Sequence, residues 1–158
     1  MELESWQAPP GDTIPNNPTF PVLIYHGVDV SDPRALFAEH GWGGSWTGHV
    51  FQFHHFHSTS HEVLAVIKGH ATIQLGGPQG KPFDVAVGDV LVLPAGTGHF
   101  RTASGDGFTV VGAYPHGQED YDLLREADDA ARERIANLGP PPQDPVGGDG
   151  VALWRGQE

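Results

Sequence analysis

Four side chains that can bind a metal ion stand in two short motifs of this sequence. The first motif places His55, His57 and Glu62 close together, and the second ends at His99 after turn-forming residues, as Gly88-x5-Pro94-x-Gly96-x2-His99. Imidazole nitrogens and a carboxylate oxygen suit Fe(II), Mn(II), Ni(II), Cu(II) or Zn(II). Four such ligands on an octahedral ion leave two positions for water or a substrate. The motifs therefore predict a reactive site for one divalent transition metal ion.

A β scaffold would bring these four side chains together. Successive side chains of a strand point to opposite faces, so His55 and His57 should share an interior face. A turn-like Ser-Thr-Ser stretch would return the chain with Glu62 toward them, and the loop 94–98 would deliver His99 from a distant strand. Several apolar side chains could form a cavity around the ion, although core packing is their commoner role: Phe51, Phe53, Leu64, Val66, Ile73 and Leu75.

Other interpretations of the histidines are weaker. Five of them fall within 13 residues, which could also mark a histidine-rich surface: His49, His54, His55, His57 and His61. On a helix, His57 and His61 would form a zinc pair, but the intervening Ser-Thr-Ser and the β context oppose a helix. The stretch from His61 begins like H-E-x-x-H and lacks the second histidine, which excludes the metalloprotease interpretation.

Five further polar side chains lie near the motifs. His54 and His61 would point to the opposite face of their strands from His55 and Glu62. They are expected to be solvated, with a place at the rim of the site as the alternative. Arg101 shares the strand parity of His99 and could point inward. An exterior salt bridge is favoured for Arg101 over bidentate binding of a substrate carboxylate. Tyr114 and His116 are weaker candidates for proton transfer, and no catalytic residue is assigned.

The elements that must hold the site are mostly strands. A composition of 22 Gly, 14 Pro and only 18% charged residues indicates short strands joined by tight turns. Strand-length runs between such turns are predicted at 49–57, 62–68, 70–76, 82–87, 89–93, 98–103 and 107–114. An all-β core over residues 46–114, in the form of a small barrel or sandwich, is the expected fold.

The flanking segments complete a single domain over residues 1–158. Residues 1–20 contain four prolines and should form an extended N-terminal arm. A strand at 21–25 and a short helix at 33–40, begun by an Asp-Pro pair, should follow. Residues 119–158 should form a helical and irregular C-terminal extension, with one helix within about 120–137. The tail carries three apolar side chains that should contact the domain or a second subunit: Val151, Leu153 and Trp154.

Charge and composition exclude several classes of partner. The formal charge is −12, from 20 acidic and 8 basic residues, and the only lysines are Lys68 and Lys81. Without a basic stripe, nucleic acid and anionic membranes are not expected partners. No signal peptide and no run of about 20 apolar residues is found, so we expect a cytoplasmic protein. Because the sequence has no cysteine, a metal ion must be held by nitrogen and oxygen.

The two motifs resemble those of the cupin superfamily, G-x5-H-x-H-x3-4-E-x6-G and G-x5-P-x-G-x2-H-x3-N. The matching residues are His55, His57, Glu62, Gly69, Gly88, Pro94, Gly96 and His99. Gly48 lies one position too far upstream and Ala103 replaces the final Asn, but neither position is a metal ligand in the family. Within cupins, the segments TIPNN at 13–17, FHHFHS at 53–58 and VGAYP at 111–115 resemble the YjlB type. The resemblance implies a small jelly-roll barrel, also called a double-stranded β-helix.

Together these features predict a metal-dependent enzyme that acts on a small organic molecule. Dioxygenase-type oxidation is expected with iron, and isomerase, lyase or hydrolase chemistry with zinc, nickel or manganese. A non-catalytic binding or sensor module is the alternative, because no general base or nucleophile is identifiable beyond the ligands. The arm and the edge strands predict a homodimer.

Overall fold

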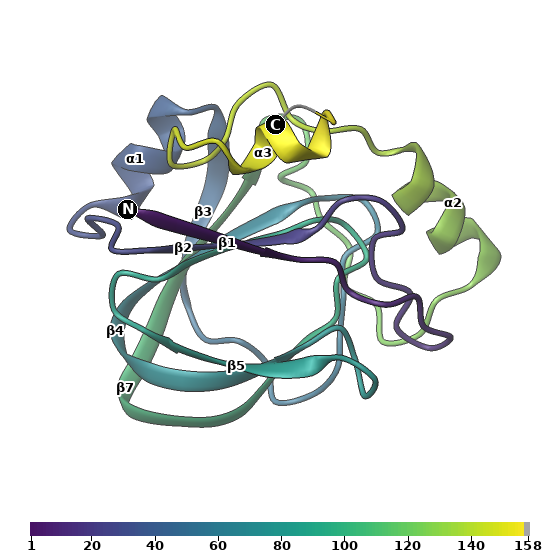
Figure 1. The fold of residues 1–158 in the computed structure, drawn as a ribbon, viewed down its shortest axis with the longest axis horizontal. Helices are drawn as coiled ribbons and strands as arrows, with labels where there is room; N and C mark the ends of the chain where they lie inside the picture. Colours follow the sequence, from purple (N-terminus) through teal and green to yellow (C-terminus); the bar gives the residue numbers. More distant parts are fainter. Residues whose placement is uncertain (157–158) are drawn as a thin grey trace.

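The computed structural model describes residues 1–156, which form mainly antiparallel β structure. Its elements, in chain order, are β1 Glu2–Trp6, β2 Val22–His26, α1 Pro33–Glu39, β3 Trp42–Gly48, β4 Glu62–Leu75, β5 Lys81–Ala86, β6 Val90–Leu93, β7 His99–Pro115, α2 Asp129–Asn137 and α3 Gly150–Trp154. Seven strands form one sheet in the order β1-β2-β6-β4-β7-β3, with β5 paired to β4. The sheet curls into a barrel-like shape (Figure 1). The predicted all-β class is confirmed.

Two long strands replace four of the predicted short ones. Strand β4 merges the runs 62–68 and 70–76, and β7 merges 98–103 and 107–114. Gly69 adopts φ +70° inside β4, where an added Cβ would lie 2.4 Å from the carbonyl oxygen of Gly105. The register of β4 and β7 shifts on either side of this point. Gly69 and Gly105 therefore lie at bulges, which bend the paired strands and do not end them.

The predicted strand at 49–57 is wrong, and the strand next to it was missed. Strand β3 lies just upstream, while residues 49–57 are irregular apart from isolated bridges of His55 to His99 and Phe56 to Leu124. The backbone of this stretch bonds to several segments in turn: to β7, to the 94–98 loop and to Leu124. No single partner strand is available for a continuous ladder, so the stretch is not a strand. His55 and His57 still project to the same side, as predicted from alternation.

The N-terminal segment is more regular than expected. Of the expected arm at 1–20, residues 2–6 form β1. This strand pairs antiparallel with β2, in a register that places Glu2 opposite His26 and Trp6 opposite Val22. The predicted strand near 21–25 is confirmed as β2, and the predicted helix near 33–40 as α1. The Asp32 side chain accepts a hydrogen bond from the Ala35 amide and so caps α1.

The sheet buries both of its faces. The inner face packs Leu64, Val66 and Leu91 inside the barrel. The outer face packs Val63 and Ala65 against α1, α3 and the C-terminal segment, which lie on one side of the sheet (Figure 1). The predicted tail contacts are confirmed, because Val151 is 0% and Trp154 5% exposed. The predicted C-terminal helix is confirmed as α2.

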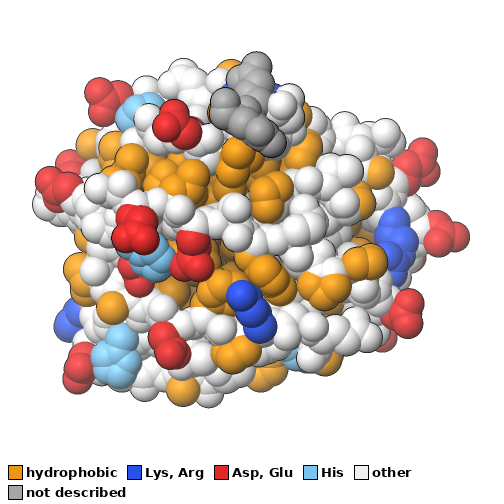
Figure 2. All heavy atoms as spheres, viewed as in Figure 1, with side chains coloured by type: hydrophobic (Ala, Val, Ile, Leu, Met, Phe, Trp, Pro, Cys, Tyr) orange, Lys and Arg blue, Asp and Glu red, His pale blue; other side chains and the backbone are white. Residues whose placement is uncertain are grey.

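The surface agrees with the net charge. Acidic side chains are spread over the face drawn in Figure 2, whereas basic ones are few. No helix among residues 1–156 is long and apolar enough to cross a membrane.

Candidate metal centre

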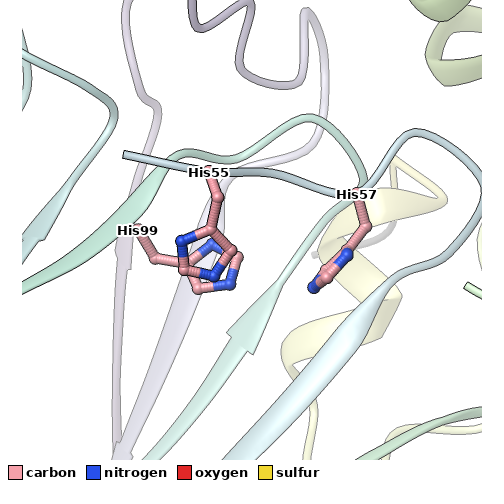
Figure 3. Close-up of side chains that lie close together, drawn as sticks. All are labelled: His55, His57 and His99. Carbon is pink, nitrogen blue, oxygen red and sulfur yellow. The ribbon is translucent and has the colours of Figure 1, made fainter. Parts of the chain in front are cut away.

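Three of the predicted ligands converge at one end of the barrel. One nitrogen atom from each of His55, His57 and His99 lies within 4.8 Å of the other two. The three side chains are at most 5% exposed. His99 begins β7, and the other two project from the irregular stretch before β4, with their rings turned toward a common space (Figure 3). This cluster could hold a metal ion.

The backbone fixes which nitrogen each imidazole offers. The Nδ1 atoms of His55 and His99 lie 3.0 Å from the carbonyl oxygens of Phe53 and Thr97, and Nδ1 of His57 contacts the carbonyl of Asp122. A carbonyl oxygen only accepts, so each Nδ1 carries the proton. The Nε2 lone pairs are therefore left for a cation, which is the arrangement that metal-binding histidines adopt.

Glu62 lies beside the three-histidine cluster and is buried. Its Oε1 is 3.2 Å from His99 Nε2, and its Oε2 is 3.5 Å from His57 Nε2. The Tyr114 hydroxyl donates to Oε2 at 2.7 Å and accepts a hydrogen bond from Trp46 Nε1 at 2.8 Å. One carboxylate oxygen is thus held by the protein, and the other faces the imidazoles. Glu62 lies beside the imidazoles, as the sequence predicted, because the side chains of β4 alternate regularly over residues 62–66.

The electrostatics of the site favour a bound cation. Burial lowers the pKa of His55 to about 3, with a further contribution from His99. Burial alone would lower the pKa of His57, but the charge of Glu62 and a hydrogen bond to it raise that pKa above its usual value. Burial alone would raise the pKa of Glu62, yet His57 and His99 hold it well below its usual range. Glu62 is thus an anion in a buried site, where a metal ion would balance its charge.

The cluster lies in a cavity of about 140 Å³. The residues around it are Trp46, His49, Val50, Phe51, His55, His57, Glu62, Leu64, His99, Tyr114, Tyr121 and Leu123. Phe51 and Leu64 line it as predicted, although Phe51 is 51% exposed and so lies at the rim. The other four predicted lining residues do not line this cavity, and three of them pack in the inner core: Val66, Ile73 and Leu75.

Sequence reasoning missed the segment 118–124, which closes one side of the cavity. Tyr121 stacks on Tyr114 with ring centroids 4.3 Å apart and meets the edge of His57 at 5.0 Å. The Asp122 carboxylate accepts hydrogen bonds from the backbone amides of Ser58 and Thr59, at 2.7 and 3.2 Å. Asp122 therefore both anchors this segment and, through its carbonyl, orients His57. No local pattern signals such a role, because the contacts span more than 60 residues.

His61 and Arg101 behave differently from the predictions. His61 is fully buried, and the expectation of a solvated side chain was wrong. Its Nδ1 accepts from the Ala95 amide and its Nε2 donates to the Gly139 carbonyl, both at 2.9 Å, so no nitrogen is left for a metal. Arg101 forms no salt bridge with any residue from 1 to 156, so the favoured exterior ion pair was also wrong. Its side chain bonds to the Val50 carbonyl and the Ser104 hydroxyl.

The remaining polar candidates lie outside the cluster. His54 is half-buried and packs its ring edge-on against Phe100, with centroids 4.7 Å apart. His116 is exposed and lies 3.2 Å from Glu119. Tyr114 contacts the site through Glu62, and burial and the Glu62 charge raise its pKa far above the usual value. Its hydroxyl therefore stays protonated and acts as a donor.

Comparison with known proteins agrees with this geometry. Residues 46–111 match the family model described as "Cupin domain". The uncharacterized protein YjlB of Bacillus subtilis (strain 168) is 38% identical over 153 residues, which cover 93% of this chain and 92% of that protein. The chain is a cupin. The resemblance to YjlB-type cupins that the motifs indicated is confirmed.

Solved structures also match this cupin, at low similarity. Oxalate decarboxylase from Bacillus subtilis at pH 4.6 is 17% identical, with a TM-score of 0.39 over 82% of this chain and 35% of that one. Acireductone dioxygenase from Bacillus anthracis, with a cadmium ion in its active centre, is 22% identical, with a TM-score of 0.34 over 60% of this chain and 49% of that one. The cupin thus spans less than half of either solved chain, and scores this low carry no argument about its site.

Proposed function

We propose that this cupin is a metal-dependent enzyme that acts on a small organic molecule. His55, His57, His99 and Glu62 would bind one divalent transition metal ion. The observation that carries the proposal is the set of three imidazoles whose Nδ1 atoms bond to backbone carbonyls, which leaves three Nε2 atoms for an ion in one cavity. The Glu62 carboxylate lies within 3.5 Å of two of these Nε2 atoms. Three nitrogens and one oxygen are the donor set that Fe, Mn, Ni, Zn or Cu accepts.

The residues around the ion would position and shield a substrate. A bound ion would supply dioxygenase-type oxidation if it is iron, or Lewis-acid chemistry of an isomerase, lyase or hydrolase if it is zinc, nickel or manganese. Tyr114 keeps Glu62 oriented. Leu64, Val50 and Tyr121 give the cavity an apolar wall that excludes water. A volume of about 140 Å³ is close to that of cavities known to hold benzene, so the part of the substrate beside the ion should be compact.

An open coordination position is the requirement that separates an enzyme from a structural metal site. Protein loaded with Mn(II) should shorten the relaxation time of water protons, because a coordinated water molecule exchanges with the solvent. Loaded protein with neither an exchangeable water nor any binding of azide would contradict the proposal. The matched control is His57→Ala treated with the same Mn(II), which measures the contribution of unbound ion.

A non-catalytic binding or sensor protein is the second candidate. It is favoured by the scarcity of proton-transfer groups: besides the four proposed ligands, the titratable residues described around the cavity are His49, Tyr114 and Tyr121, and the Tyr114 hydroxyl is already bonded to Glu62. A metabolite retained through purification, and not consumed by the metal-loaded protein, would favour this candidate over catalysis.

We further propose a homodimer that pairs through a sheet edge. Strands β1 and β3 end the strand order, so each has one edge without a partner strand in the described chain. Such edges pair readily with a second copy. Light scattering should give a mass about twice the 16.9 kDa of one chain, and a mass near that of one chain would contradict the dimer.

A further inference from the structure

A second hollow opens beside the metal-site cavity and continues it toward the surface. The two share five lining residues: Trp46, His49, Val50, Phe51 and Tyr121. This outer hollow, here called the vestibule, has a volume of about 420 Å³ and is completed by Gly48, Gln52 and Arg101. A molecule in the cavity would therefore extend into the vestibule.

Arg101 is the one residue carrying a full positive charge among those described around either space. It pairs in register with Ile73, whose side chain lies in the inner core, and this pairing places Arg101 on the inner side of β7. Its Nε donates to the Val50 carbonyl at 3.0 Å, and its Nη1 to the Ser104 hydroxyl at 2.9 Å. These two bonds hold the guanidinium at the mouth of the cavity.

Some N–H donors of the Arg101 guanidinium have no acceptor among the recorded hydrogen bonds. A guanidinium has five N–H donors, and the recorded bonds account for two of them. No carboxylate of residues 1–156 lies within salt-bridge distance of Arg101. The unused donors lie on Nη1 and Nη2, the pair that binds a carboxylate with two parallel hydrogen bonds.

The surroundings of Arg101 define the charge of the ligand. In a chain of net charge −12, a single arginine beside a largely apolar cavity balances one negative charge, and the second charge of a phosphate monoester would have no partner. The other polar side chains of the vestibule carry no full charge: His49, Gln52, Tyr121 and Trp46. Of these, His49 is already bonded through Nδ1 to the Phe108 carbonyl, and Trp46 through Nε1 to the Tyr114 hydroxyl. A carboxylate on an otherwise uncharged molecule is therefore the group that fits.

We propose that the vestibule is a carboxylate subsite anchored by Arg101. The substrate class is then a compact organic acid whose carboxylate lies at Arg101 and whose largely apolar remainder reaches the floor of the cavity. The role of that remainder as the reacting part depends on the proposed function, whereas recognition of the carboxylate does not. The subsite can therefore be tested on protein without metal.

Calorimetry on metal-free protein tests the subsite with matched probes. The panel consists of benzoate, phenylacetate and the straight-chain carboxylates from propanoate to hexanoate, each beside its primary amide, together with phenyl phosphate. At least one carboxylate should bind about 10- to 100-fold more tightly than its amide, the ratio that charge-assisted hydrogen bonds contribute. Arg101→Gln should remove this preference and leave the binding of the amide unchanged.

Two further variants make the result specific. Arg101→Lys keeps the charge without the paired donors and should retain a smaller preference, which can be measured even if the glutamine variant folds poorly. Arg155→Gln removes the same charge outside both hollows and should bind like the wild type. The proposal is overturned if no carboxylate binds better than its amide, if Arg101→Gln weakens acids and amides equally, or if phenyl phosphate binds more tightly than every carboxylate.

Repeating the titration after metal loading separates the two proposals. A preference for carboxylates in a protein that takes up no metal would refute the proposed function and leave the subsite intact. Metal uptake without any preference for carboxylates would refute the subsite and leave the proposed function intact.

Discussion

Two buried tyrosine–carboxylate pairs lie on opposite faces of the same sheet and are completed in different ways. On the outer face, the Tyr25 hydroxyl donates to Asp144, whose two oxygens also accept backbone amides from residues 146–151 at 3.0–3.2 Å. On the inner face, the Tyr114 hydroxyl donates to Glu62 at 2.7 Å. The other neighbours of the Glu62 oxygens are the Nε2 atoms of His57 and His99.

The difference separates a polar pair that is satisfied within the chain from one that faces a cavity. The outer pair satisfies its hydrogen-bonding capacity within the chain and so fastens the C-terminal segment to β2. The inner pair leaves the carboxylate beside the Nε2 lone pairs of His57 and His99, which only a cation or protons can satisfy. The same contrast separates His61, with both nitrogens bonded to backbone, from His57, with one nitrogen bonded and one facing the cavity.

The largest expected effect on stability comes from the outer pair. Asp144→Ala would leave the Tyr25 hydroxyl and several buried amides without an acceptor, and should lower the free energy of unfolding by about 3 kcal/mol or more. Denaturant unfolding measures this change. Asp149→Ala, at an exposed neighbour that makes no capping bond, should change stability by less than about 0.5 kcal/mol. Equal effects of the two variants would refute the structural role of Asp144.

A second large effect should appear as acid is added to metal-free protein. Burial lowers the pKa of His61 to about 4, whereas the unfolded chain has a pKa near 6.5. At pH values between these two, the unfolded state binds a proton at His61 and the folded state does not. The free energy of unfolding should therefore fall as the pH drops from about 6.5 to about 4, by roughly 3 kcal/mol from this residue. His61→Gln, measured by unfolding across this range, should flatten that part of the profile. An unchanged pH dependence in the variant would exclude His61 as its source.

The smallest expected effect sharpens the comparison of the two tyrosines. Tyr114→Phe removes the donor that holds Glu62 and should weaken metal binding by about 10-fold, as is usual when a partner that orients a ligand is lost. Tyr25→Phe should lower the melting temperature and leave metal affinity unchanged. Competition with a chelator of known affinity measures both variants. Equal metal affinity in Tyr114→Phe and the wild type would show that Tyr114 does not orient the ligand.

The sequence predicted the site better than its supporting structure, for a physical reason. Ligand spacing is local, and alternation over residues 62–66 was sufficient to place the Glu62 carboxylate beside the imidazoles. The stretch 49–57 is not a strand because its backbone bonds to several different segments, and no local pattern reveals those partners. The wall formed by Tyr121 depends on hydrogen bonds that the Ser58 and Thr59 amides donate to the Asp122 carboxylate, which no local pattern reveals.

Burial was also difficult to predict where it depends on distant chain. Strand parity correctly kept His61 out of the metal cluster, but its outward direction was interpreted as exposure to solvent. The C-terminal extension covers that face, and the Gly139 carbonyl reaches His61 from 78 residues away. An outward-facing residue on a sheet is solvated only if nothing else packs over the sheet.

Metal content of three matched proteins tests the central claim most directly. Wild type, His57→Ala and His61→Gln should be purified without added metal, reconstituted in parallel and analysed for bound elements. We expect near-stoichiometric transition metal in the wild type and in His61→Gln, and loss of the metal in His57→Ala. Absence of metal from the reconstituted wild type, or equal metal in wild type and His57→Ala, would contradict the assignment of these histidines as ligands.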